Sequence, residues 1–157
     1  LNKKSIGIEI SNKGHQFGYE NYSKKQIKSL IKLSKFLIKK YRIKKSNILG
    51  HSDIAFDRKK DPGEKFPWEK LAKKKIGFWH SYKSNELVKF RRVRILKKSK
   101  FEFIKNLVKI GYCFEGKKKS NLTKIVKAFQ MRFRQKLING IIDKECLLIA
   151  QNLSKKL

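Results

Sequence analysis

A chain of 157 residues is long enough for one domain, or for one domain with a small appendage. Hydrophobic residues make up 39% of it and aromatic residues 11%, so the chain can build a core despite a formal net charge of +30. No apolar run approaches the ~20 residues that a membrane span needs, and the first residues lack the pattern of a signal peptide. Two cysteines, Cys113 and Cys146, are too few for a disulfide framework. Both lie in apolar stretches, which favours core packing, although they could pair in an exported protein.

The positive charge is spread along the whole chain. Lys and Arg number 42 against 12 Asp and Glu, and arginines cluster only in residues 91–94 and 132–134. Specific nucleic-acid readers concentrate basic residues on one face with interleaved aromatics. The spread therefore favours a lysine-biased composition, or a general attraction to anionic polymers, over a specific nucleic-acid groove. A basic nucleic-acid binder is the less favoured alternative.

Residues 5–10 alternate strictly between apolar and polar or small side chains, with Ile6, Ile8 and Ile10 on one side. This period of two predicts a β-strand with one apolar face. Glu9 projects from the other face. It is a candidate general base if that face forms the floor of a cleft, and an ordinary surface residue if the face is simply exposed.

The next elements predict a strand, a helix and a second strand. A polar and aromatic loop carrying His15 leads to Ser23, which opens a capping box and a helix to about Tyr41 with a clear apolar stripe. The apolar run at residues 47–50 is typical of a buried strand. Such an order favours a βαβ unit with parallel strands, and functional sites gather at the carboxyl ends of parallel strands.

The loop at residues 50–68 carries the chemistry. His51 stands at the end of the second predicted strand, and Asp61 comes just before a Pro-Gly pair that stiffens and turns the backbone. A neutral imidazole and a carboxylate are ligand types that zinc takes. Lys59 would place an ammonium group close to such an ion. The alternative is a surface histidine, a helix-capping aspartate and a solvated basic loop.

The second half of the chain predicts helices. A short helix should follow the loop, and Trp68 at its start is either a cleft wall or, as we favour, a core residue. Residues 81–98 lose periodicity and are dense in charge, which is typical of a linker. Three helices should follow, capped by Ser99, Ser120 and Asp143.

Taken together, these segments resemble the zinc-dependent N-acetylmuramoyl-L-alanine amidases of the amidase type 2 family. The residues that carry the resemblance are Ser-Ile-Gly-Ile-Glu-Ile at 5–10, the run at 50–68 and Ile-Gly-Phe-Trp at 76–79. Residues 128–134, Ala-Phe-Gln-Met-Arg-Phe-Arg, match the signature Ala-Phe-Gln-x-x-Phe-Arg of a small peptidoglycan-binding helical module. The family branch that carries this module at its C-terminus is the most similar one.

The resemblance implies an α/β fold, a mixed sheet with flanking helices, followed by a small three-helix domain. Residues 1–80 would be the C-terminal portion of the catalytic domain, 81–98 a linker and 99–157 the peptidoglycan-binding helical domain. The implied enzyme is a Zn²⁺ hydrolase that cuts the amide between N-acetylmuramic acid and L-alanine in peptidoglycan or muropeptides. The implied site comprises the metal ligands His51 and Asp61, the catalytic residues Glu9 and Lys59, and the substrate contacts His15 and Trp68.

One feature of the family pattern has no counterpart. The first zinc ligand of these amidases is a histidine in a strand before the Gly-Ile-Glu segment, and neither His15 nor His80 matches that position. The chain is therefore expected to be either a truncated amidase or a catalytically incompetent wall-binding protein. In either case it should show little or no hydrolysis, in contrast to a version extended upstream. We expect a monomer in the bacterial cell envelope, the periplasm being favoured and the cytoplasm being the alternative.

Overall fold

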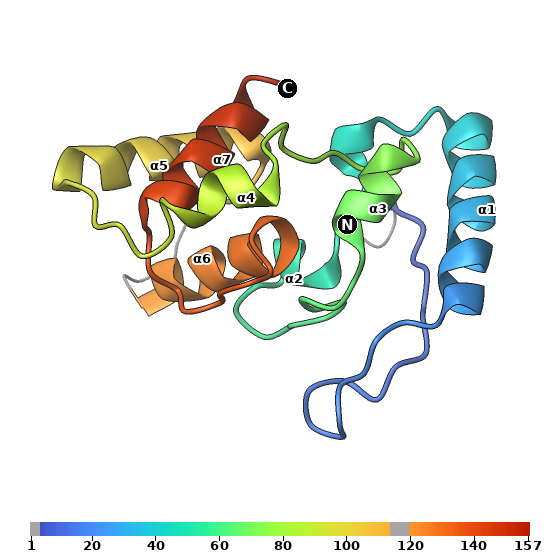
Figure 1. Ribbon diagram of the computed structural model, residues 1–157. Coiled ribbons are helices and arrows are strands. Elements are labelled where there is room, and N and C mark those ends of the chain that lie inside the picture. The colour runs from blue at the N-terminus through green and yellow to red at the C-terminus, as the bar shows by residue number, and fades with distance from the viewer. Residues whose placement is uncertain (1–3, 114–119) are drawn as a thin grey trace.

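The structure, a computed structural model, describes residues 4–113 and 120–157. Within these ranges the chain forms seven α-helices and one short 3₁₀-helix (Figure 1). In chain order they are α1 (Lys24–Tyr41), η2 (Lys45–Asn47), α2 (His51–Ile54), α3 (Trp68–Lys73), α4 (Ser84–Val88), α5 (Lys97–Ile110), α6 (Ser120–Phe133) and α7 (Lys144–Ser154). α1 and α3 lie on one side of the molecule and α4 to α7 on the other, with α2 between α3 and α6.

The predicted mixed sheet is absent from the part of the chain that the structure describes, so the α/β fold class is wrong for it. Residues 5–13, predicted to begin with a strand, have no regular secondary structure, and the side chains of Ile6 and Ile8 are 50% and 39% exposed. A strand needs a neighbour for its backbone hydrogen bonds and for its apolar face. The residues that the structure describes include no strand that could supply both, and Ile10 packs against the core near α1.

The second predicted strand, at residues 47–50, is also absent. Two of its backbone groups form hydrogen bonds with side chains and not with a neighbouring strand. The carbonyl oxygen of Ile48 accepts a hydrogen bond from the Arg132 guanidinium at 2.8 Å. The amide of Gly50 donates to the Asp53 carboxylate at 2.7 Å. The chain then enters α2 directly, so the expected βαβ unit does not form.

The helix caps predicted at Ser23 and Asp143 are confirmed, whereas the capping box predicted at Ser99 is wrong. Ser23 and Gln26 form the capping box that opens α1, and Asp143 caps α7 by accepting from the amide of Cys146 at 2.9 Å. α5 starts at Lys97, ahead of the predicted cap at Ser99, and ends at a glycine in the left-handed conformation. None of the helices in residues 4–113 and 120–157 is long and apolar enough to cross a membrane.

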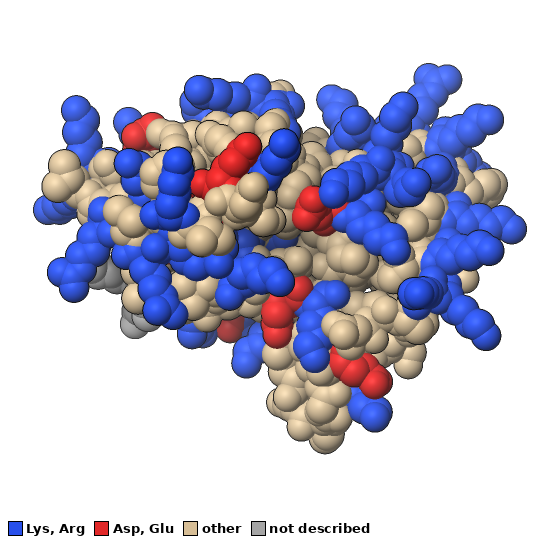
Figure 2. Space-filling model, viewed as in Figure 1, with Lys and Arg blue, Asp and Glu red and all other residues tan. Residues whose placement is uncertain are grey.

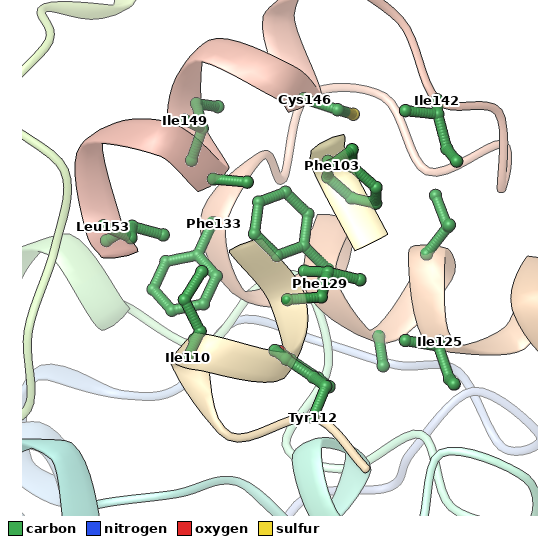
Figure 3. Packing of buried hydrophobic residues seen from close by; sticks show 14 of the residues in the cluster. Phe103, Ile110, Tyr112, Ile125, Phe129, Phe133, Ile142, Cys146, Ile149 and Leu153 are labelled. Atoms are coloured by element: carbon green, nitrogen blue, oxygen red, sulfur yellow. The ribbon is translucent and has the colours of Figure 1, made fainter. Parts of the chain in front are cut away.

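Two hydrophobic clusters hold the molecule together. The larger one is built mainly from α5, α6 and α7, with Phe103, Phe129 and Phe133 at its centre (Figure 3). The ring centroids of Phe103 and Phe129 lie 5.3 Å apart in an edge-to-face arrangement, which aromatic pairs prefer. The smaller cluster joins α1 and α3 to the end of the 50–68 loop. Trp79 packs against both.

The larger cluster also takes residues from outside the last three helices. Phe56, which follows α2, is buried in it, and so is Leu87 of α4. Residues 81–98, predicted as a linker, thus contain a helix with a core side chain. Of the two cysteines, neither of which is in a disulfide, Cys146 is buried in this cluster and Cys113 is exposed.

The core around α5 offers a matched pair of substitutions. Phe103 is 0% exposed and Phe101, on the same helix, is 64% exposed. We expect Phe103→Ala to lower the free energy of unfolding by roughly 3–5 kcal/mol, because it removes transfer energy and leaves a cavity. Phe101→Ala should stay within about 0.5 kcal/mol. Urea unfolding followed by circular dichroism measures both, and equal effects would contradict this packing.

Burial of His80 predicts a pH dependence. The imidazole is buried between the rings of Trp79 and Tyr82, and desolvation is the main cause that lowers its pKa to about 4. The unfolded chain then binds the proton near pH 6.5 and the folded chain only near pH 4. Stability should therefore fall as the pH drops through this window, by up to roughly 3 kcal/mol from this residue.

The variant His80→Gln isolates that contribution, since it keeps a polar side chain that does not titrate. Unfolding free energies measured between pH 7 and pH 4 should fall more steeply for the wild type than for the variant. Parallel curves would show that His80 keeps an ordinary pKa in the folded protein.

Candidate metal site

His51 and Asp61 lie side by side on the surface. His51 is the first residue of α2, and Asp61 lies on the loop that follows this helix. The imidazole Nδ1 and the carboxylate Oδ2 are 3.0 Å apart, and the two side chains are 45% and 61% exposed. The amide of Ser52 donates to the Asp61 carbonyl oxygen at 2.8 Å and so closes the loop back onto α2. The structure thus brings together the two predicted metal ligands.

The spacing of this pair suits a shared cation. Two donor atoms at zinc–nitrogen and zinc–oxygen bonding distances from one tetrahedral ion lie about 3.4 Å apart. The observed 3.0 Å between Nδ1 and Oδ2 is a direct hydrogen bond, so a shared ion would replace this bond and the two atoms would move apart by a few tenths of an ångström. A catalytic zinc usually keeps three protein ligands. In residues 4–113 and 120–157 no group of three His, Cys, Asp or Glu side chains is placed to hold a metal, so the described site supplies two.

Two tyrosines fix the loop beside Asp61. The hydroxyl groups of Tyr19 and Tyr22 donate to the Pro62 carbonyl oxygen at 2.7 Å and 2.9 Å. The Tyr19 hydroxyl oxygen also accepts from the amide of Lys65 at 2.9 Å. Burial is the main cause that raises the pKa of both phenols, and the Asp61 charge adds to it at Tyr22. Both hydroxyls therefore stay protonated and can keep donating to Pro62.

Two glycines permit the close approach of these segments. Gly63 has φ +78°, and a Cβ there would lie 2.6 Å from the Tyr19 hydroxyl oxygen and 3.0 Å from Cε1 of His15. A Cβ on Gly50 would lie 2.7 Å from Cδ of Pro62. Distances of 2.6 and 2.7 Å are too short for a Cβ, so any larger residue at Gly63 or Gly50 would force Tyr19 or Pro62 to move.

The two predicted substrate contacts occupy different surroundings. His15 lies on the rim of the loop, with Nε2 3.0 Å from the Glu64 carboxylate and its ring centroid 4.4 Å from that of Tyr19. Trp68 is buried, as favoured from the sequence. The Arg132 guanidinium lies 4.3 Å from its ring centroid. Trp68 thus supports the loop from the core side, while His15 is accessible from solvent.

In the described part of the chain, neither of the two predicted catalytic residues forms a side-chain hydrogen bond or ion pair with His51 or Asp61. Glu9 is exposed in the irregular N-terminal segment, and its carboxylate forms no hydrogen bond or ion pair with the described residues. Lys59 is half-buried, and its backbone amide donates to the carbonyl oxygen of Ala55 at 2.8 Å. Its ammonium group has no carboxylate partner in the part of the chain that the structure describes.

A buried polar network under α2 escaped the sequence analysis. Asp53 forms an ion pair with Arg132 of α6, and the two side chains are only 4% and 3% exposed. The Tyr112 hydroxyl donates to the other Asp53 oxygen at 2.8 Å. One signal in the sequence could have indicated such a network: a single arginine stands among the apolar residues of 125–133, where a buried charge needs a partner.

The residues of the helical signature hold the helical part together. Gln130 is fully buried, and its amide oxygen accepts from the backbone amides of Asn139 and Gly140 at 3.0 and 2.8 Å. Its amide nitrogen donates to the Ile141 carbonyl oxygen at 2.9 Å. Arg134 is buried beside the Asp143 carboxylate at 3.5 Å. These side chains tie α6 to the turn before α7.

The chain is similar in sequence to known amidases. A family profile described as N-acetylmuramoyl-L-alanine amidase matches residues 1–64. The N-acetylmuramoyl-L-alanine amidase AmiD of Escherichia coli (strain K12) is 36% identical over 166 aligned positions, which cover 99% of this chain and 59% of AmiD. The 1,6-anhydro-N-acetylmuramyl-L-alanine amidase AmpD of Enterobacter cloacae is 39% identical over 72 positions, or 45% of this chain and 35% of AmpD.

Solved structures share the fold. E. coli AmiD in complex with anhydro-N-acetylmuramic acid-L-Ala-D-gamma-Glu-L-Lys superposes with a TM-score of 0.75 at 33% identity, covering 88% of this chain and 55% of that one. AmpDh3 of Pseudomonas aeruginosa superposes with a TM-score of 0.74 at 28% identity, covering 89% of this chain and 56% of that one. The chain thus spans little more than half the length of these relatives.

The fit around Gly63 leads to a further test with a matched control. Gly63 and Gly14 have similar backbones, with φ +78° and +72°, but nothing lies within 4 Å of a Cβ on Gly14. Both alanine variants should lose about 1–2 kcal/mol of unfolding free energy to the left-handed conformation. Gly63→Ala should lose at least about 1 kcal/mol more, because its methyl group displaces Tyr19. Chemical denaturation measures the difference, and equal losses would contradict the contact.

Proposed function

Since residues 1–64 match the N-acetylmuramoyl-L-alanine amidase family profile and 99% of the chain aligns with one such amidase, we propose that the chain carries part of an amidase active site that acts on muropeptides. The observation that carries the proposal is the exposed His51–Asp61 pair at 3.0 Å. The bond to be cut is the amide between the lactyl group of N-acetylmuramic acid and L-alanine of the stem peptide.

The proposed cofactor is zinc, with His51 and Asp61 as two of its ligands. Bound zinc lowers the pKa of a coordinated water to ~7, which makes hydroxide available at neutral pH. The neutral imidazole and the carboxylate are ligands of the right chemical type, and both are open to solvent on the same side of the loop. With two protein ligands in the described residues, we expect weaker zinc binding than at a complete three-ligand site.

The chain's own residues have distinct proposed roles around that position. Glu9 would accept a proton from the attacking water and pass it to the leaving amine. Lys59, two residues before Asp61, would place its positive charge near the oxygen that becomes negative in the transition state. His15, on the rim of the same loop, would contact the substrate, and Trp68 would hold the loop from below.

The charge of the chain favours such a substrate. Lys and Arg side chains are spread over the whole face seen in Figure 2, with acidic side chains in a few small groups. Muropeptide stems carry carboxylates, so this field raises their local concentration and the rate of encounter. We propose a bacterial cell-wall context, with the periplasm favoured over the cytoplasm.

A second candidate function is wall binding without catalysis. It is favoured by the finding that the described residues supply two metal ligands and that Glu9 makes no contact with them. In this case the chain would retain affinity for peptidoglycan and release no L-alanine amino termini.

Zinc titration provides the first test. We expect calorimetry with zinc to show one site that is lost in His51→Ala and in Asp61→Asn. Asp57→Asn is the matched control, since Asp57 is exposed on the same loop and its contact in the described residues, from Lys124 Nζ at 3.2 Å, is to its backbone carbonyl oxygen, which the substitution keeps. Binding that survives both ligand substitutions would contradict the proposed site.

Hydrolysis provides the second test. Release of L-alanine amino termini from an anhydromuramyl tripeptide should be slow, because the described residues supply two metal ligands, and it should depend on added zinc. It should be lost in Glu9→Gln and in Asp61→Asn. Asp57→Asn should match the wild type. If the wild type binds peptidoglycan but releases nothing at saturating zinc, the wall-binding function holds instead.

A further inference from the structure

We propose that Arg132 is a positioning residue for the His51–Asp61 pair. The helical part of the chain would then do more than bind substrate, because α6 sets the orientation of α2, the helix that begins with His51. The inference rests on the proposed function only in taking this pair as the metal site. The coupling itself follows from the contacts of Arg132.

α2 depends on its surroundings for its shape. A helix of four residues has too few internal hydrogen bonds to be stable alone. Asp53, in the middle of α2, accepts from the Gly50 amide at 2.7 Å and from the Tyr112 hydroxyl at 2.8 Å, and it pairs with Arg132. Because Asp53 and His51 lie in the same helical turn, holding the Asp53 carboxylate in place also sets the direction in which the His51 side chain points.

Arg132 contacts the loop segment at three separate points. Its guanidinium pairs with Asp53, donates to the carbonyl oxygen of Ile48 at 2.8 Å and lies 4.3 Å from the ring centroid of Trp68. These points lie before α2, within α2 and at the start of α3. Just beyond α6, Gln135 adds a hydrogen bond from its Nε2 to the Phe66 carbonyl oxygen at 2.7 Å.

The neighbouring polar residues of α6 have a different role. Gln130 and Arg134 bind the turn at residues 139–143 and Cys146 within the helical part. Arg132 instead binds segments of the α2 and α3 region, and α6 contacts both helices (Figure 1). The fold of the helical part thus uses Gln130 and Arg134, whereas Arg132 serves the contact with α2.

Energetics favour a positioning role over a stabilising one. Removing two charges from water costs roughly as much as their attraction returns, so a buried ion pair adds little stability compared with apolar side chains. It does impose a direction, because a carboxylate accepts from guanidinium only in a few geometries. The pair between Asp53 and Arg132 therefore orients α2 more than it stabilises the fold.

The test measures amide hydrogen exchange by NMR in the full chain. The key amide is that of Ser52, whose hydrogen bond to the Asp61 carbonyl oxygen joins the two sides of the pair. In Arg132→Met we expect exchange at Ser52 to be at least about tenfold faster, while the amide of Leu153 in α7 keeps its wild-type rate. The zinc-induced change in the His51 resonances should be lost at the same time.

Two further variants separate positioning from general destabilisation. Arg132→Lys keeps the charge beside Asp53 and should restore part of the Ser52 protection. Arg91→Met removes another arginine–carboxylate pair, that with Glu145 at 2.8 Å, and should leave Ser52 unchanged. If Arg132→Met does not fold, Asp53→Asn provides the same comparison, because it removes the negative charge of the Arg132–Asp53 ion pair.

The outcomes are distinct. Unchanged exchange at Ser52, or an equal increase at Ser52 and Leu153, would overturn the positioning role. A wild-type chain that binds no zinc at His51 would contradict the proposed function alone, since the exchange comparison still decides whether Arg132 holds α2.

Discussion

The buried ion pair between Arg132 and Asp53 is the interaction on which the arrangement of the two halves depends. The cluster around α1 and α3 and the cluster around α5 to α7 are separate hydrophobic cores. α2 lies between them, and the guanidinium of Arg132 contacts both Asp53 of α2 and Trp68 at the start of α3. Phe56 is buried in the larger cluster, and Trp79 packs against both clusters. The exposed His51 imidazole and Asp61 carboxylate of the candidate site are thus supported from within the protein by contacts that α6 makes through Arg132.

The same arrangement gives the signature of the helical part a structural meaning. The residues at its fixed positions are buried and hold α6 to the turn before α7. Arg132 stands at one of its variable positions. A family pattern can therefore report the fold of a module, while a position that the pattern leaves open carries the contact that couples this module to the rest of the chain.

Sequence reasoning succeeded for two of the predicted helix caps. Ser23 and Asp143 each bind an amide within three residues, so the signal is local. The similar pattern at Ser99 falls inside α5, which begins two residues earlier. The predicted sheet is wrong because a strand is defined by a distant partner strand, and the residues that the structure describes form no β-strand. The role of Arg132 was not predicted, because this residue is one member of a set of 42 Lys and Arg residues spread along the chain.

The central claim is that one cation is shared by the imidazole and the carboxylate at the end of this supported loop. A crystal structure of the chain grown with zinc tests it most directly. We expect anomalous density between Nδ1 of His51 and Oδ2 of Asp61, with the Arg132–Asp53 pair intact beneath it. Zinc bound elsewhere, or the two side chains turned away from each other, would contradict the claim.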